Sequence, residues 1–139
     1  MVLNNARQFD IETDLKMQIK TGMLDDFRNK VKTFSPDAIL VSIVEDTFLQ
    51  SLTMLRVITD LNVPALVGGV FPTMAPEVAI SAEEIRLIGL GEGENTVAAF
   101  CEAVRQRKAL NDLSNTWFKT NDGEITKNAQ VPLADINNV

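Results

Sequence analysis

The chain has 139 residues, 45% of them hydrophobic, and a formal net charge of −6, which fits one globular domain with its own core. The acidic balance argues against a broad nucleic-acid surface, because such a surface needs clustered Lys and Arg. One cysteine and no histidine exclude an internal disulfide framework, a catalytic triad that uses His, a His-bound metal and an iron–sulfur cluster held by this chain alone.

The N-terminal segment is weakly patterned. Met1–Asn5 has no cationic stretch ahead of a long apolar run, so no secretory signal is predicted, and the single cysteine fits the reducing cytoplasm. No stretch approaches the roughly 20 apolar residues of a membrane span.

Arg7–Thr13 predicts a short strand. Leu24–Phe34 has apolar residues at helical spacing, and Ser35-Pro36 is expected to end that helix.

Three short runs further along are almost entirely apolar and rich in β-branched residues. Such runs are typical of strands that are buried on both faces of a parallel sheet. The predicted strands are Ala38–Val44, Val63–Val67 and Ile85–Leu90.

Helices are predicted between and after these strands, over Asp46–Leu61, Met74–Glu84 and Asn95–Arg107. Pro76 suits the first turn of the second helix, and Cys101 lies on the apolar side of the third, where we expect it to be buried and unreactive. The alternation of strands and helices predicts an α/β fold, an open, mostly parallel sheet with helices on both faces.

The C-terminal part is different. Thr116–Thr120 and Glu124–Asn128 flank an Asp-Gly turn and predict a β-hairpin, in which Trp117 packs against the core or the hairpin. Residues 131–139 read as an extended linker. We therefore expect a domain over residues 1–130 that lacks an opening strand and helix, followed by a linker towards an absent catalytic domain.

Ligands of open parallel sheets bind at the carboxyl ends of the strands. Three such ends carry unusual residues here: Ser42–Thr47, Gly68–Thr73 and Gly91–Glu94. Gly68-Gly69 fits either a ligand lying against bare backbone or a turn that needs glycine. The sequence alone leaves both readings open.

The other two strand ends have ordinary explanations as well. Gly91–Glu94 matches no phosphate-binding glycine loop, and its carboxylates suit the start of a helix. Glu45 and Asp46 resemble the acid pair of a receiver domain, but neither Val67 nor Leu90 is followed by the aspartate that such a domain phosphorylates. No catalytic residue and no metal ligand is predicted in this chain.

Two segments together resemble a known family. Pro64–Glu77 (PALVGGVFPTMAPE) and Ile88–Thr96 (IGLGEGENT) are similar to the cobalamin-binding domain of cobalamin-dependent radical S-adenosylmethionine proteins. Ser35–Ile43 (SPDAILVSI) resembles a strand of that family, and the residues from Asn115 onwards resemble its hairpin and exit segment. The similarity covers roughly residues 34–139.

The resemblance implies a Rossmann-like, flavodoxin-like three-layer sandwich that binds cobalamin at the carboxyl edge of its sheet. It implies that the nucleotide tail of the cofactor lies beside Gly68 and Gly69 and that the corrin ring lies near Phe71. Because the chain has no histidine, the cobalamin is expected to be base-off, with no protein nitrogen on cobalt. The implied cofactor-binding residues are Ser42, Ile43, Val44, Glu45, Asp46, Thr47, Gly68, Gly69, Val70, Phe71, Thr73, Gly91, Glu92, Gly93 and Glu94.

In the family, S-adenosylmethionine and a 4Fe-4S cluster are bound by a separate catalytic domain that needs three cysteines. Cys101 alone cannot supply that site, so the isolated chain is expected to be inactive, with a radical S-adenosylmethionine domain as its partner. One alternative is a degenerate domain that binds nothing and serves as a scaffold or an oligomerisation surface. A weaker alternative is a flavodoxin-like or receiver-like signalling domain.

Overall fold

The computed structural model describes residues 21–132. The predicted strand over Arg7–Thr13 and most of the predicted linker lie outside the described residues. Among those that are described, none of the helices combines the length and apolar character that a bilayer crossing requires.

Strands and helices alternate along the chain until a final hairpin. The helices are α2 (Thr21–Phe34), α3 (Phe48–Arg56), α4 (Val70–Met74), α5 (Pro76–Ser81) and α6 (Glu94–Arg105), and the strands are β1 (Ile39–Ser42), β2 (Ala65–Gly68), β3 (Leu87–Gly89), β4 (Thr116–Lys119) and β5 (Ile125–Lys127). Two 3-10 turns flank α3, η1 over Glu45–Thr47 and η2 over Thr59–Leu61.

The five strands form one sheet in the order β1-β2-β3-β4-β5. β1, β2 and β3 run parallel, and Val67 lies opposite Ile88. β4 then pairs antiparallel with β3, placing Trp117 opposite Ile88, and β5 pairs antiparallel with β4. The predicted open, mostly parallel sheet with a C-terminal hairpin is confirmed, and the hairpin extends the same sheet.

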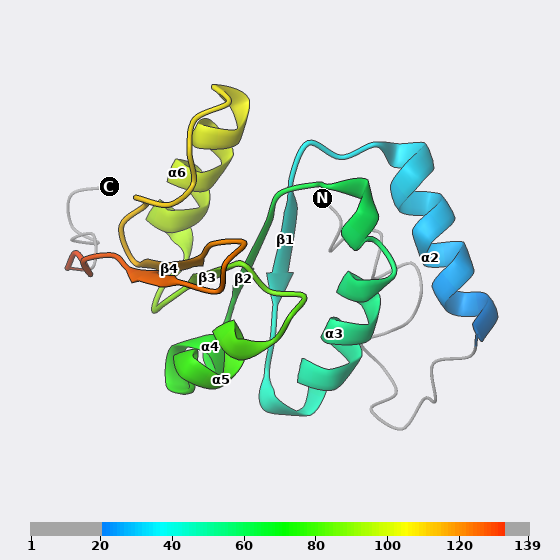
Figure 1. The fold of residues 1–139 in the computed structure, drawn as a ribbon, viewed down its shortest axis with the longest axis horizontal. Helices are drawn as coiled ribbons and strands as arrows, with labels where there is room; N and C mark the ends of the chain where they lie inside the picture. Colours follow the sequence, from blue (N-terminus) through cyan, green and yellow to red (C-terminus); the bar gives the residue numbers. More distant parts are fainter. Residues whose placement is uncertain (1–20, 133–139) are drawn as a thin grey trace.

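Helices cover both faces of the sheet and make three layers. On one face, α2, α3 and α5 contribute Phe27, Leu55 and Ile80 to a core that also contains Ile88. On the other face, Phe100 of α6 packs against Leu66 and Leu87. Figure 1 shows α2 and α3 on one side of the strands and α6 on the other.

Two details differ from the sequence-based expectations. The helix predicted over Met74–Glu84 is shorter and forms α5, and an unpredicted helix, α4, precedes it. The break falls at Ala75, because the residue before Pro76 avoids helical angles, and Ala75 has φ −136° and ψ 61°. The prediction that Cys101 is buried is wrong. The inner face of α6 consists of Thr96, Phe100 and Ala103, which leaves Cys101 on the exposed side.

The prediction for Trp117 is confirmed. Its side chain is 9% exposed and belongs to the core beside Ile88. Lys127 of the neighbouring strand lies over its ring, with the ammonium nitrogen 4.1 Å from the ring centroid.

Candidate cofactor-binding site

The two faces of the sheet differ at the carboxyl ends of β2 and β3. Side chains alternate between faces along a strand, so Val67 and Ile88 point into one core, where they are 1% and 0% exposed. The next residue in each strand points to the opposite face, and it is glycine in both cases, Gly68 and Gly89. The sheet therefore presents bare backbone towards α6 at this end.

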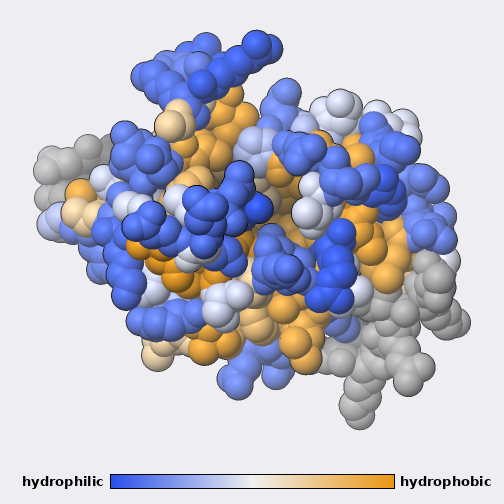
Figure 2. Space-filling view, viewed as in Figure 1, coloured by the Kyte–Doolittle hydropathy of each residue, from blue (hydrophilic) through white to orange (hydrophobic). Residues whose placement is uncertain are grey.

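A cavity of about 300 Å³ lies over this bare backbone, at the lower end of the roughly 300–1,000 Å³ range of small-molecule sites. Its walls come from three strands, the loops that follow β2 and β3, and the first turn of α6. Figure 2 shows apolar surface on the side of α6 that faces the strands. The cavity is lined by Leu40, Val41, Ser42, Leu66, Gly68, Gly69, Gly89, Gly91, Gly93, Thr96 and Val97.

Gly68 keeps this cavity open without being required by the fold. A Cβ atom at this position would have a single neighbour within 4 Å, the carbonyl oxygen of Gly89 at 3.9 Å. Its φ lies outside the left-handed range, so a larger residue fits the strand backbone. A side chain at position 68 would therefore occupy the cavity instead of disturbing the core.

Gly69 has the opposite role. Its φ of +105° is a conformation that residues with side chains rarely adopt, and a Cβ there would lie 2.8 Å from both the amide nitrogen and the carbonyl oxygen of Ile43. The chain turns so tightly because the amide of Phe71 donates a hydrogen bond to the Ile43 carbonyl oxygen. Gly69 is therefore a glycine that the turn requires, whereas Gly68 is a glycine that leaves the backbone of the sheet accessible.

Thr73 joins two of the strand-end loops. Its hydroxyl donates to the carbonyl oxygen of Gly69 at 2.9 Å and accepts from the amide of Gly91 at 3.0 Å. Gly91 has φ +73°, which allows the loop to turn back towards α6. Thr73 thus holds the loop that follows β2 next to the loop that follows β3.

Thr96 is a polar residue on the buried face of α6. It is 3% exposed, and within residues 21–132 its Oγ1 is the one buried side-chain polar atom without a hydrogen-bond partner. The methyl group of Thr96 would contact a Cβ at Gly89 at 3.5 Å, so this side chain packs against the bare strand end.

Large apolar side chains remain exposed on the segments that follow β1 and β2. Leu49, Val70 and Met74 are 74%, 65% and 78% exposed, and Val44 and Val78 are about half exposed.

The structure brings only some of the predicted cofactor-binding residues to the cavity. Those that line it are Ser42, Gly68, Gly69, Gly91 and Gly93. Val44 and Val70 lie at the exposed edge, Glu45, Asp46, Glu92 and Glu94 are exposed, and Thr47 exchanges hydrogen bonds with the Val44 backbone.

Two predicted residues face away from the cavity. Ile43 is fully buried in the core on the other face, and Phe71 packs beside it with its ring centroid 4.5 Å from that of Phe48. Ile43 can contribute only backbone atoms to a ligand on the cavity side.

Two cavity residues, Gly89 and Thr96, were not among the predicted ones, although both carry a signal in the sequence. A glycine inside an apolar strand indicates close approach by another group, and Gly89 sits in such a strand. Thr96 precedes Phe100 by four residues, so helical spacing already places it on the buried face. Leu40, Leu66 and Val97 carry no such signal, because they read as ordinary core residues.

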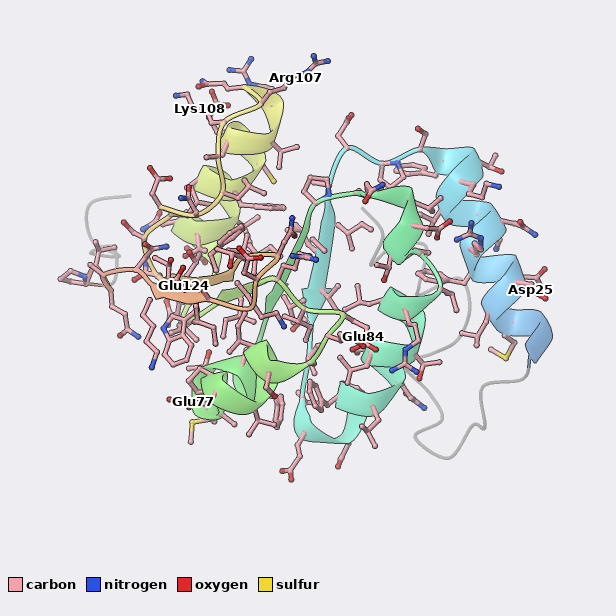
Figure 3. All side chains as sticks on the ribbon, in the orientation of Figure 1. Asp25, Glu77, Glu84, Arg107, Lys108 and Glu124 are labelled. Atoms are coloured by element: carbon pink, nitrogen blue, oxygen red, sulfur yellow. The ribbon has the colours of Figure 1, made fainter. Side chains whose placement is uncertain are left out.

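No charged residue lines the cavity. Residues 21–132 contain no cluster of Cys, Asp and Glu that could hold a metal ion. Figure 3 shows Arg107 and Lys108 together at the carboxyl end of α6, whereas the cavity lies at its amino end. The cavity is therefore suited to an uncharged group.

A second cavity, of about 320 Å³, lies at the amino ends of the strands. Its walls include Leu55, Ile58 and Phe118, which belong to the two cores, and the charged Glu84 and Arg86. Glu84 is paired with Arg56 of α3. This cavity has no glycine in its walls and no unpaired buried polar group.

A family model described as the B12 binding domain matches residues 1–101. Among solved structures, the chain is similar to the cobalamin-dependent S-adenosylmethionine radical enzyme OxsB with aqua-cobalamin and S-adenosylmethionine bound, with a TM-score of 0.63 and 19% identity over 79% of this chain and 16% of that chain. It is also similar to the radical S-adenosylmethionine methyltransferase TsrM from Kitasatospora setae with cobalamin and a [4Fe-4S] cluster bound, with a TM-score of 0.65 and 14% identity over 80% of this chain and 22% of that chain.

These two structural similarities establish the fold and its resemblance to domains of radical S-adenosylmethionine enzymes. The chain spans less than a quarter of either enzyme. No curated protein matches the sequence.

Proposed function

Because the chain belongs to the B12-binding domain family, we propose that it is the cobalamin-binding module of a radical S-adenosylmethionine enzyme. The observation that carries this proposal is the cavity over Gly68 and Gly89, which opens at the carboxyl edge of the parallel strands. This is the edge at which open α/β sheets bind their ligands.

The residues of the cavity fit the uncharged base of the nucleotide tail of cobalamin. Gly68 and Gly89 leave the strand backbone bare, and Leu40, Leu66 and Val97 provide apolar walls for a flat ring. The Gly91–Glu94 loop closes the side next to α6. Outside the cavity, the exposed Val70 and Met74 offer a surface for the much larger corrin ring.

The cofactor is proposed to bind base-off. The chain contains no histidine that could reach cobalt with an imidazole nitrogen, and a nucleotide base inside the cavity is separated from the metal. When bound, cobalamin supplies the organometallic chemistry of the parent enzyme. This chain contributes binding, orientation and exclusion of water from the tail.

The remaining chemistry is assigned to a partner domain. Residues 1–130 would form the module and residues 131–139 would lead to a radical S-adenosylmethionine domain, which binds S-adenosylmethionine and the iron–sulfur cluster. The isolated chain is expected to show no S-adenosylmethionine cleavage, because Cys101 cannot hold a cluster alone.

Uptake of hydroxocobalamin tests the proposal. The wild-type chain should retain the cofactor through gel filtration, as shown by visible absorption of the protein peak. Gly68→Val should lose it, since the valine side chain fills the cavity without a backbone clash. The control is Gly22→Val, because a Cβ at Gly22 has no neighbour within 4 Å and this residue lies in α2, outside the cavity.

The two possible failures have different meanings. A wild-type chain that retains no cobalamin would favour the degenerate scaffold. Retention by Gly68→Val at the wild-type level would instead show that cobalamin binds somewhere other than this cavity. Electron paramagnetic resonance of bound cob(II)alamin then tests the base-off state, because nitrogen coupling to cobalt would contradict it.

A further inference from the structure

The final hairpin returns the chain to the edge of the sheet at which the cavity lies. β4 begins at Thr116, opposite Gly89 at the carboxyl end of β3, and runs antiparallel to that strand. β5 runs back along β4, and the amide of Asn128 donates to the carbonyl oxygen of Thr116. The post-hairpin segment, residues 129–132, therefore leaves the sheet beside the carboxyl end of β3.

Asn115, the residue before β4, bonds to chain segments on both sides of that strand. Its carbonyl oxygen accepts from the amide of Leu90, which follows β3, at 2.8 Å. Its amide donates at 3.0 Å to the carbonyl oxygen of Ala129 in the post-hairpin segment. In a regular antiparallel strand the N–H and C=O of one residue bond to the same neighbour. The left-handed φ of 60° at Asn115 turns its amide to the opposite side.

The side chain of Asn115 adds a third hydrogen bond. Its Oδ1 accepts from the amide of Val131 at 2.8 Å, so the post-hairpin segment is held at two points, Ala129 and Val131. A left-handed φ suits glycine at least as well as asparagine, so the backbone conformation does not by itself explain an asparagine here. What asparagine adds is the oxygen that holds Val131.

The carbonyl oxygen of Asn115 is connected to a wall of the cavity. Leu90, its partner, lies between Gly89 and Gly91, and both glycines line the cavity. The same loop is held at Gly91, whose amide donates to the hydroxyl of Thr73. A ligand that fills the cavity contacts the backbone on either side of Leu90 and restricts the loop to which Asn115 is bonded.

We infer that Asn115 is a positioning residue that couples occupation of the cavity to the path of the post-hairpin segment. The inference rests on the proposed cobalamin-binding function and deepens it, since it states how the module responds to its cofactor. When the ligand restricts the loop, Asn115 loses freedom with it, and less entropy opposes the bond from Val131 to Oδ1. The loaded module then holds the post-hairpin segment in one direction, at the edge where the cofactor binds.

Amide hydrogen exchange at Val131, with and without hydroxocobalamin, tests this coupling. In the wild-type chain, saturating hydroxocobalamin should slow the exchange about threefold to tenfold, the range of one partly exposed hydrogen bond. Asn115→Gly keeps the left-handed backbone and removes Oδ1, so Val131 should exchange faster and should not respond to the ligand. Asn115→Asp keeps an acceptor oxygen and should retain the response.

Asn62→Gly is the matched control. Asn62 also has a left-handed φ, of 53°, and its side chain donates to the carbonyl oxygen of Asp60 in η2. It does not line the cavity over Gly68 and Gly89. This variant makes the same exchange of residue type elsewhere in the chain, and Val131 should respond to hydroxocobalamin as it does in the wild-type chain.

The outcomes separate this inference from the proposed function. The role of Asn115 is overturned if the wild-type chain binds hydroxocobalamin with unchanged exchange at Val131, or if Asn115→Gly keeps the response. Loss of the response in Asn62→Gly or in Asn115→Asp would also overturn it, because the effect would then not depend on Oδ1. Each of these results leaves cobalamin binding standing. A wild-type chain that binds no hydroxocobalamin would overturn both.

Discussion

The two faces of this sheet are built from the same strands but differ at their carboxyl ends. On one face, Val67 and Ile88 fill a core shared with α2, α3 and α5. On the other, Gly68 and Gly89 occupy the equivalent places and leave a cavity under the first turn of α6. The first face is packed with core side chains, whereas the second face has no side chains at the ends of β2 and β3.

Because side chains alternate between the two faces along a strand, a glycine can open a cavity on one face while its neighbour fills the core on the other. In both β2 and β3 a leucine points to the α6 face, the next residue enters the opposite core, and a glycine follows. Leu66 and Leu87 anchor α6, and the glycines open space just beyond them. Mutations of adjacent residues should therefore separate stability from binding.

The largest effect is expected from Ile88→Ala on the filled face. Ile88 is fully buried, and a large-to-small change in such a core costs about 3–4 kcal/mol of unfolding free energy. Urea denaturation measures it. Gly89→Ala, one residue away, should change stability by less than about 1 kcal/mol, because its Cβ would make ordinary contacts at 3.5 Å.

The next largest effect is expected within the glycine pair. Gly69→Ala should destabilise the chain by about 2–3 kcal/mol, since it puts a side chain at φ +105° and against the Ile43 backbone. Gly68→Ala should unfold close to the wild-type urea concentration. Equal loss of stability in both variants would contradict the separate roles assigned to these neighbours.

Features that depend on local sequence could be predicted, whereas features that depend on contacts between residues distant in sequence could not. The apolar runs predicted the strands, the Asp-Gly turn predicted the hairpin, and the strand ends predicted the edge at which the cavity lies. Local pattern could not tell Gly68 from Gly69, because their difference depends on the Ile43 backbone, which is distant in sequence. The same limit applies to Cys101, whose exposure depends on which side of α6 meets the sheet.

Thr73→Val probes the link between the walls of the cavity. It removes one hydrogen bond to Gly69 and one from Gly91, a loss of about 1–2 kcal/mol at most for a partly exposed residue. Hydrogen exchange at the Gly91 amide should become faster than in the wild-type chain. Unchanged exchange there would show that the loop is held by other contacts.

The smallest effect is expected on the outer side of α6. Hydrogen bonding from Arg105 lowers the pKa of Glu102 to about 2, from an unfolded value near 4.3. A lowered folded-state pKa gives stability that is present above the unfolded pKa and is lost as the pH falls towards the folded one. Glu102→Gln should therefore flatten the fall in melting temperature between about pH 4.5 and pH 2, slightly because the group is exposed.

This variant also serves as a control for the comparison of the two faces. Glu102 lies on the exposed side of α6, so Glu102→Gln should leave cobalamin affinity unchanged. A marked loss of affinity would mean that the binding surface extends beyond the cavity and around the helix.

The most direct measurement is an amide chemical-shift map of the ¹⁵N-labelled chain during titration with hydroxocobalamin. We predict that the largest shifts fall on Gly68, Gly89, Gly91 and Thr96, around the bare strand ends and the first turn of α6. Shifts concentrated instead at the amino ends of the strands, around the cavity beside Glu84 and Arg86, would contradict it.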